Sequence, residues 1–275
     1  MSSIKDRQRA AARARLEKEM AERATAAKKR RQRQAVIGSA AAVVVIAGAA
    51  VWIVTALRDD DKTSNKAGAP PAGTVACTWI PVDAGSGAKV KDVGTPPANV
   101  PNTGKATLTM NTNLGPIAAT VDNSKAPCTS AAFTHLASKQ FWNNTKCHRL
   151  TTEGIKVLQC GDPFATGKGW RPTDGQGGPS FRYAEENLPT DKNPPYPVGT
   201  IAMAKTQQPS STGSQFFIVW GDTPLPAQYT VLGTVTSGMD IVQSVAKAGT
   251  DNANAPGDGH PKKEVVISKL TMAPA

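Results

Sequence analysis

Two stretches of the sequence carry residue types that together could bind a ligand. Arg149 supplies a guanidinium, and the run from Thr212 to Trp220 is a small-residue turn followed by an alternating, aromatic-rich strand. In an extended strand Gln215 and Phe217 point to one side, while their hydrophobic neighbours point to the other. An amide and an aromatic ring on one face, near an arginine from elsewhere, predict a shallow binding surface. The opposite face is expected to belong to the core (Phe216 and Ile218).

The residue sets that attack a substrate covalently are absent from the sequence. Ser214 does not lie in a Gly-x-Ser-x-Gly elbow, and none of the three histidines has an obvious acidic partner. Glycine-rich pieces within 161–199 lack the strand-to-helix context of a phosphate-binding loop. What remains is one strong hydrogen-bond donor, Arg149, with amides and apolar side chains, so we expect binding chemistry that needs no cofactor and no metal. These amides and apolar residues are Gln159, Gln215, Ile155, Met203, Phe217 and Leu225.

The positive charge of the chain is concentrated at its N-terminus. Residues 1–33 contain twelve Lys and Arg against four acidic residues, and therefore hold +8 of the net charge of +11. Such a run can bind nucleic acid by displacing counterions from phosphates. The next segment argues against that function, because residues 35–57 carry no charge. At about 1.5 Å per residue, a helix of this length covers the roughly 30 Å hydrocarbon core of a membrane.

Residues 35–57 are therefore predicted to form one transmembrane helix. A signal peptide is the alternative, but its apolar core is usually about 7 to 15 residues long, which is shorter than this segment. Positive charge beside a first helix stays on the cytoplasmic side. We expect residues 1–34 to be a basic cytoplasmic tail, either lying as a helix on the membrane surface or solvated. Everything from residue 58 onward would lie outside a cell membrane that the chain crosses once.

Four cysteines, all after the expected membrane span, predict two disulfides on the exported side. Three pairings are possible. If Arg149 and Gln159 face the same side of a hairpin, Cys147 shares that face and Cys160 takes the opposite one. This disfavours a Cys147–Cys160 bond unless a bulge intervenes. A zinc site is the alternative, but no two histidines stand at ligand spacing. The other two cysteines are Cys77 and Cys128.

Composition divides the exported part into three segments. Residues 58–73 are polar and contain Pro and Gly, which is typical of a flexible linker. Residues 74–103 hold short apolar and extended pieces. We expect them to be pinned to the following domain by a disulfide of Cys77, and not to form a domain of their own. The regular pattern that continues to the C-terminus indicates one folded domain over residues 104–275.

Within this domain the periodicity favours strands. Alternation at 107–112 and 117–121 around a turn predicts a hairpin. Apolar spacing predicts a helix capped by Thr129 or Ser130, and a second helix over 239–248 that stops at Gly249. Further strands are expected at 156–159, 200–204, 214–219, 230–235 and 264–270. Because strands far outnumber helices, the predicted fold is mainly β, a closed or nearly closed antiparallel barrel with two helices.

These residues carry a resemblance to a known family. The pieces that carry it are Cys147-His148-Arg149-Leu150, Val157-Leu158-Gln159-Cys160-Gly161-Asp162, Ala202-Met203-Ala204, Gly213-Ser214-Gln215-Phe216-Phe217-Ile218 and Tyr229-Thr230-Val231-Leu232-Gly233. In their order and spacing they resemble the cyclophilin family of peptidyl-prolyl cis/trans isomerases, over residues 104–272. More closely, the chain looks like the membrane-anchored, exported cyclophilins of actinobacteria.

The resemblance implies an eight-stranded closed antiparallel barrel capped by two helices, and isomerisation of X-Pro peptide bonds. It implies that Arg149 donates a hydrogen bond to the substrate near the prolyl nitrogen, while Gln159 holds the moving carbonyl side. The implied partners are proline-containing peptides and unfolded exported proteins. The sequence gives no sign of oligomerisation, so a monomer is expected. The implied substrate-binding residues are His148, Ile155, Met203, Ala204, Lys205, Gln215, Phe217, Leu225 and Tyr229.

Three positions depart from the commonest pattern of the family. Ile155 stands where a Phe is usual, Leu225 where a Trp often contacts cyclosporin, and Tyr229 where a rim His is found. We therefore expect isomerase activity with weakened cyclosporin binding. His148 is expected to pack structurally and not to act as a base. A proline-binding adaptor or holdase with little turnover stays the alternative function.

Overall fold

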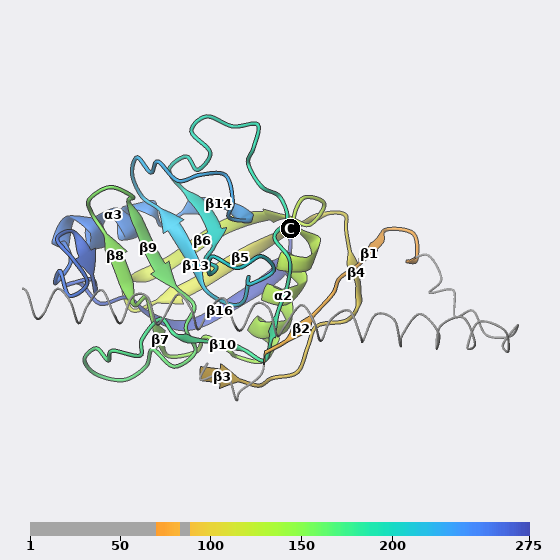
Figure 1. The fold of residues 1–275 in the computed structure, drawn as a ribbon, viewed down its shortest axis with the longest axis horizontal. Helices are drawn as coiled ribbons and strands as arrows, with labels where there is room; N and C mark the ends of the chain where they lie inside the picture. Colours follow the sequence, from red (N-terminus) through yellow and green to blue (C-terminus); the bar gives the residue numbers. More distant parts are fainter. Residues whose placement is uncertain (1–69, 83–88) are drawn as a thin grey trace, which may run out of the picture. The chain divides into compact units, whose positions relative to one another are not determined.

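A computed structural model of the chain describes residues 70–82 and 89–275. The predicted basic tail, the membrane span and most of the predicted linker lie outside these residues. Within the described residues, no helix is both long enough and apolar enough to cross a membrane. They form a mainly β fold in which a strongly curled antiparallel sheet is accompanied by two helices (Figure 1).

The main sheet has ten strands, in the order β15-β8-β9-β13-β12-β14-β6-β5-β16-β7. The family resemblance implies a closed barrel of eight strands, whereas the observed sheet is open, ends at β15 and β7, and has two strands more. The difference arises because the stretch from Thr145 to Thr151 is interrupted at Cys147 and His148, so it forms two strands, and because a short strand, β15, adds beside β8. The strands are β5 (Lys105–Thr112), β6 (Gly115–Asp122), β7 (Thr145–Lys146), β8 (Arg149–Thr151), β9 (Val157–Cys160), β12 (Thr200–Met203), β13 (Phe216–Val219), β14 (Val231–Ser237), β15 (Asp258–Gly259) and β16 (Val266–Pro274).

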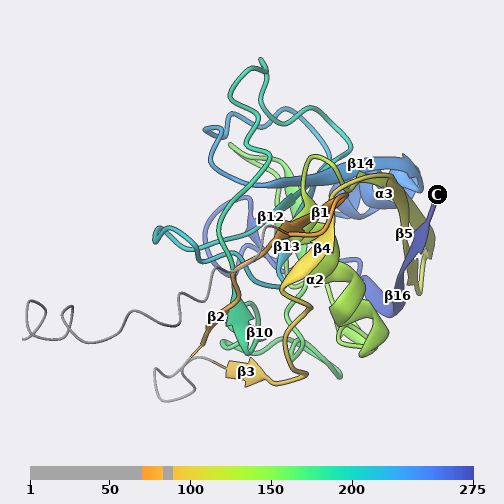
Figure 2. The ribbon, with the colours of Figure 1, turned by 90° about the vertical axis from the view of Figure 1, so that its right-hand side faces the viewer.

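The core lies inside the curl of this sheet and follows from strand alternation. In the predicted hairpin β5–β6, Leu108 and Met110 of one strand and Ile117 of the other are buried, whereas the residues between them are more exposed. Both helices lie against this sheet (Figure 2), and both contribute apolar side chains to the same cluster. These side chains are Phe133 and Leu136 of α2 (Pro127–Ser138), and Val242 and Val245 of α3 (Met239–Ala248).

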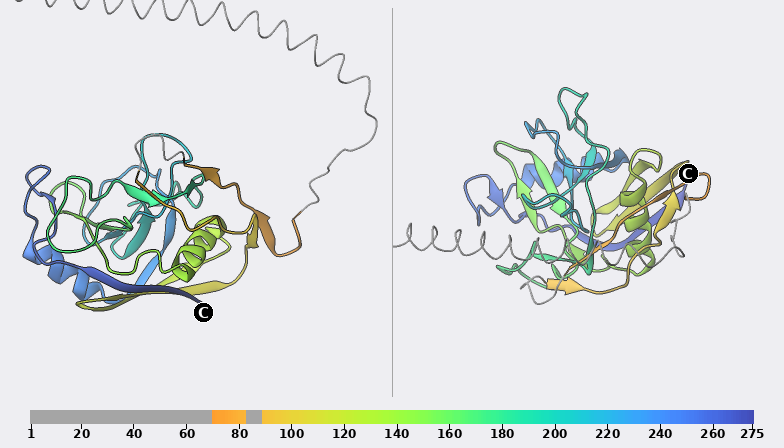
Figure 3. Two further views of the ribbon diagram at one scale, coloured as in Figure 1. Left: turned by 90° about the horizontal axis from the view of Figure 1, so that it is seen from below. Right: turned by 45° about the vertical axis from the view of Figure 1, so that its right-hand side comes forward.

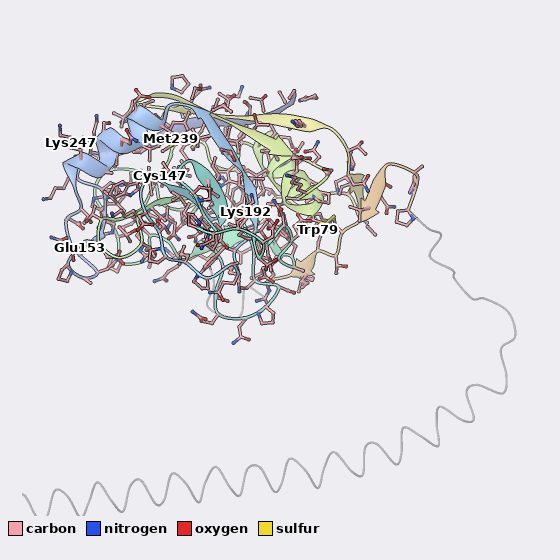
Figure 4. The ribbon with its side chains drawn as sticks, turned by 90° about the horizontal axis from the view of Figure 1, so that it is seen from above. Trp79, Cys147, Glu153, Lys192, Met239 and Lys247 are labelled. Atoms are coloured by element: carbon pink, nitrogen blue, oxygen red, sulfur yellow. A yellow bond between two sulfur atoms is a disulfide. The ribbon has the colours of Figure 1, made fainter. Side chains whose placement is uncertain are left out.

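The two helices differ in how well the sequence predicts their ends. Met239 begins α3 as predicted and Gly249 follows its last residue; Met239 and Lys247 are labelled on this helix in Figure 4. The prediction for α2 is wrong, because it begins at Pro127 and neither Thr129 nor Ser130 is its N-cap. Proline fits the first turn, where its missing N–H would have no partner. The N–H of Thr129 instead donates to the Glu186 carboxylate at 2.6 Å, so a distant loop caps this helix.

Two disulfides join the four cysteines, Cys77 with Cys128 and Cys147 with Cys160. The second pairing is the one that the parity argument disfavours, so that prediction is wrong. Side-chain parity along β8 and β9 holds only within their ladder, and Cys147 lies beyond its end. The register pairs Arg149 with Gln159 and continues to Leu150 with Leu158, but Cys147 lies in the break between β7 and β8. The chain therefore turns the Cys147 side chain inward, where both cysteines are fully buried.

The described residues of the segment 74–103 pack on the rest of the described chain and run beside α2 (Figure 3). The Cys77–Cys128 disulfide bonds it to that helix. Trp79 packs its ring edge-on against Phe181 and Tyr183, with centroid distances of 5.3 and 5.5 Å. The segment's strands are β1 (Thr74–Ala76), β2 (Ile80–Pro81), β3 (Lys89–Lys91) and β4 (Asn99–Pro101); β1 pairs with β4, β2 with β11 (Phe181–Arg182), and β3 with β10 (Gly177–Pro179).

Candidate functional site

Strand register places the predicted site residues in one row. Arg149 on β8 pairs with Gln159 on β9, and Gln159 in turn pairs with Phe217 on β13. Phe217 pairs with Ala202 on β12. Residues that are directly paired across antiparallel strands share a face of the sheet. The guanidinium, the amide and the aromatic ring therefore stand side by side on the outer face of the curl.

The two faces of β13 have the separate roles that the sequence predicts. Phe216 and Ile218 belong to the main core, whereas Phe217 and Val219 belong to a second apolar cluster on the outer face. Tyr196 lies in this second cluster, where its hydroxyl donates to the Tyr229 carbonyl at 3.0 Å and accepts from the Tyr229 N–H at 2.8 Å. This pair of hydrogen bonds fixes the backbone of Tyr229, whose ring packs edge-on against Phe217 with a centroid distance of 5.6 Å.

A cavity of about 160 Å³, called here the Phe217 cavity, opens on this face. Eight predicted site residues line it together, although they are spread from Arg149 to Tyr229 in the sequence. Val157 is the lining residue that the sequence analysis missed. The lining residues are Arg149, Ile155, Val157, Gln159, Ala204, Lys205, Phe217, Leu225 and Tyr229.

Asp258 fixes the orientation of the Arg149 guanidinium. Arg149 donates its Nε–H to Asp258 Oδ1 at 2.9 Å and an Nη2–H to Oδ2 at 2.7 Å, which is the bidentate geometry of strong arginine–carboxylate pairs. Asn254 donates to Oδ1 of the same carboxylate at 3.0 Å. The hydrogen bond that Arg149 donates to Asp258 raises the pKa of Arg149, and the same bond holds the pKa of Asp258 below its ordinary value. Sequence analysis missed Asp258, which lies 109 positions away from Arg149.

A chain of amides, called here the amide chain, holds the other side of the guanidinium. Gln215 donates its Nε2 hydrogens to the carbonyls of Gly175 and Gly177, at 2.8 and 2.9 Å. Because these carbonyls can only accept, they fix which end of the Gln215 amide is oxygen. That oxygen accepts from Gln159 Nε2 at 3.0 Å, which turns Gln159 Oε1 towards Arg149 Nη1 at 3.3 Å. Two of the five guanidinium N–H groups then stay available to a ligand.

Three predicted binding residues lie outside the Phe217 cavity. Met203 is fully buried in the main core, because it faces the opposite side of β12 from Ala202 and Ala204. Gln215 lines a neighbouring cavity of about 360 Å³. His148 lies behind Arg149 with 5% of its surface exposed, and neither of its ring nitrogens has a hydrogen-bond partner within the described residues.

The burial of His148 determines its protonation. Desolvation lowers its pKa to about 4, against the opposing effect of Asp162 and Asp174. At neutral pH it is therefore an uncharged, packed residue, in agreement with the structural role expected from the sequence. The described residues contain no group of three His, Cys, Asp or Glu side chains arranged to hold a metal ion.

The fold and the site together define a mainly β protein with a small, partly apolar cavity beside a fixed guanidinium. Residues 107–272 match the model of a family described as cyclophilin type peptidyl-prolyl cis-trans isomerase/CLD, and the chain belongs to this family.

Curated relatives carry the corresponding names. The chain is 42% identical to the probable peptidyl-prolyl cis-trans isomerase B of Mycobacterium leprae over 196 residues, which cover 66% of this chain and 62% of that protein. It is 33% identical to the peptidyl-prolyl cis-trans isomerase A of Mycobacterium tuberculosis over 189 residues, covering 61% and 92% of the two chains. The chain thus spans about three fifths of the length of the isomerase B relatives it matches.

A solved structure shows the same fold. The Cryptosporidium parvum cyclophilin type peptidyl-prolyl cis-trans isomerase superposes with a TM-score of 0.52 at 23% identity, covering 62% of this chain and 99% of the other.

Proposed function

We propose that this protein catalyses cis/trans isomerisation of X-Pro peptide bonds. The main support for this proposal is that Arg149 and Phe217 line the same cavity. The cavity offers an apolar wall for a proline ring, made by Phe217, Ile155 and Leu225, and a cationic donor at its edge. Family membership supports the assignment, and a related Cryptosporidium enzyme was solved in the presence of the dipeptide Ala-Pro.

The reaction needs no covalent intermediate. Rotation about the X-Pro bond meets a barrier of roughly 20 kcal/mol because the C–N bond is partly double. As the bond twists, the lone pair localises on the prolyl nitrogen, and a nearby N–H donor stabilises that state more than the planar one. Arg149 would supply this donor while Gln159 holds the moving carbonyl side. Because Asp258 and the amide chain fix the guanidinium beforehand, little reorganisation accompanies the twist.

The test is the isomerisation rate of a proline peptide, followed by NMR exchange spectroscopy with full-length protein solubilised in mild detergent. Replacement of Arg149 by Ala should lower kcat/KM by about 10²-fold or more, the usual effect of removing one preorganised donor. Arg171→Ala is the matched control, because it removes a half-exposed, ion-paired guanidinium that does not line the Phe217 cavity. Equal rates for wild type and Arg149→Ala would overturn the catalytic assignment.

One observation favours a second function, a proline-binding adaptor or holdase. The Asp258 carboxylate partly neutralises Arg149, which would weaken its field at the prolyl nitrogen without weakening the apolar pocket. Peptide titrations followed by chemical shift separate the two functions. Saturable binding of proline peptides without faster exchange would favour the adaptor.

We also propose that the domain is exported and tied to the cell membrane by residues 35–57, with residues 1–34 in the cytoplasm and unfolded exported proteins as clients. The support is the uncharged 23-residue run that follows the basic segment. Protease treatment of intact cells should cleave the part after residue 58. Protection of that part until the cells are lysed would overturn this orientation.

A further inference from the structure

The segment 74–103 supplies a wall of a second cavity beside the candidate active site. This cavity, called here the Lys89 cavity, has a volume of about 360 Å³, and Val82, Lys89 and Val90 line it. The strand β3 brings Lys89 and Val90 there by pairing in parallel with β10, in the register Lys89 to Gly177 (Figure 2). The residues matched by the family model begin at 107, so this wall lies outside the part of the chain that the family model matches.

The two cavities adjoin each other. Gln159, Ala204 and Lys205 line both the Lys89 cavity and the Phe217 cavity. A peptide whose proline occupies the Phe217 cavity therefore presents a neighbouring side chain to the Lys89 cavity. Glycines at 178 and 213 contribute no side chain to its lining, which leaves room for that group.

The lining of the Lys89 cavity is cationic. Lys89, Arg182 and Lys205 line it, and no described carboxylate does. Lys89 donates one N–H to the Thr173 hydroxyl at 2.8 Å, so two ammonium hydrogens stay available. Glu185 lies 3.6 Å from the Lys205 ammonium and offsets one of the three charges. The described residues that line the cavity therefore keep a net positive charge.

Several contacts hold this wall in place. Lys91 donates to the Phe141 carbonyl at 3.0 Å, and the Ser180 hydroxyl donates to the Asp92 carboxylate at 2.6 Å. The Cys77–Cys128 disulfide and the Trp79 contacts fix the preceding part of the segment. Lys89 is therefore presented by an anchored strand, which reduces the entropy lost when a ligand binds.

We propose that the Lys89 cavity binds an acidic side chain of the substrate, one or two residues from the proline, and that Lys89 is the residue that selects it. This inference rests on the proposed isomerase function, and it names the substrate class: proline peptides with Asp or Glu on one side of the proline. An attractive charge pair in this half-buried position favours such peptides over neutral ones, and a basic side chain at the same position is repelled.

A peptide panel tests the proposal. Each peptide has one central proline and a single Glu, Gln or Lys at one of the two positions before it or the two after it. Affinity is measured by chemical-shift titration and catalysis by exchange spectroscopy, both on full-length protein. Wild type should prefer Glu over Lys by roughly three- to tenfold on one side of the proline only, and the preference should shrink as salt is added.

Lys89→Glu should abolish or reverse that preference while leaving the affinity for the Gln peptides within about twofold. Lys269→Glu makes the same charge change on an exposed strand residue outside both cavities, and should keep the wild-type preference. Equal affinities of wild type for Glu and Lys peptides at every position would overturn the inference while isomerase activity stands. Selective binding that Lys89→Glu reverses, without any acceleration of exchange, would support the inference and overturn the proposed function.

Discussion

Arg149 and Asp258 form a bidentate ion pair in which the carboxylate takes the Nε and Nη2 hydrogens and leaves Nη1 facing Gln159. The guanidinium plane is therefore set by a residue from β15, a two-residue strand that pairs with β8. The ion pair has two opposite effects on catalysis. It partly neutralises the positive charge of Arg149, which is unfavourable, and it fixes the orientation of the Arg149 N–H donors, which is favourable. We expect orientation to dominate, because a small misplacement of a catalytic group costs more than partial neutralisation at a half-exposed site.

Asp258→Asn should therefore lower kcat/KM for proline peptides by roughly tenfold, mainly through kcat. The Arg149 Nε–H signal in a nitrogen-correlated NMR spectrum should move and exchange faster with water. Asp251→Asn is the control, since Asp251 lies in the same loop but pairs with His260. A variant with unchanged kcat and an unchanged Arg149 signal would show that the ion pair does not position the donor.

The pH dependence of stability should reveal the lowered pKa of His148. Its folded pKa of about 4 lies below the ordinary value of 6.5, so its contribution is fully present above pH 6.5 and is lost as the pH falls towards 4. The free energy of unfolding should fall by roughly 3 kcal/mol over this range. Urea denaturation at several pH values should show a smaller fall for His148→Gln than for wild type. Identical slopes for the two proteins would contradict the buried, neutral assignment.

The two disulfides should contribute unequally. The bond between Cys77 and Cys128 closes a loop of sequence separation 51, and that between Cys147 and Cys160 one of 13. On chain entropy alone, these correspond to about 4 and about 3 kcal/mol. Guanidinium denaturation of the two Cys-to-Ser double variants should rank them in that order. The opposite order would mean that native packing around Cys147 and Cys160 outweighs loop entropy.

Cyclosporin should inhibit the protein weakly. Leu225 lines the Phe217 cavity, and a leucine offers neither the area nor the N–H donor of the Trp expected there by resemblance. Leu225→Trp should lower the inhibitory concentration by roughly tenfold or more. Leu188→Trp, at an exposed leucine outside that cavity, serves as the control. Tight inhibition of the wild type would show that Leu225 does not set the affinity.

Local patterns in the sequence predicted several of the elements that position the site, but not the short strands β8 and β15. Alternation identified the β5–β6 hairpin and the two faces of β13, and apolar spacing with a terminal glycine identified α3. These elements depend on neighbours in sequence or on short ladders, which is why periodicity reports them. The family resemblance, and not periodicity, led to eight of the residues that line the Phe217 cavity.

The parts that were missed depend on contacts between distant segments. Asp258 lies in a strand of only two residues and Glu186 lies outside the helices and strands, so neither shows a periodic pattern, and each acts on a partner brought close only by the fold. The Cys147–Cys160 bond was misjudged because a strand break does not show in alternation. Met203 was placed in the pocket although it alternates with Ala202 and Ala204 and belongs to the core.

The covalent tie between Cys77 and α2 has a practical consequence for shortened versions of this protein. A fragment that begins at residue 104, where the family resemblance starts, would leave Cys128 with a free thiol beside Glu186. It would also uncover the faces of Phe181 and Tyr183 on which Trp79 lies. Such a fragment would tend to cross-link and aggregate, and its failure in an assay would say nothing about catalysis.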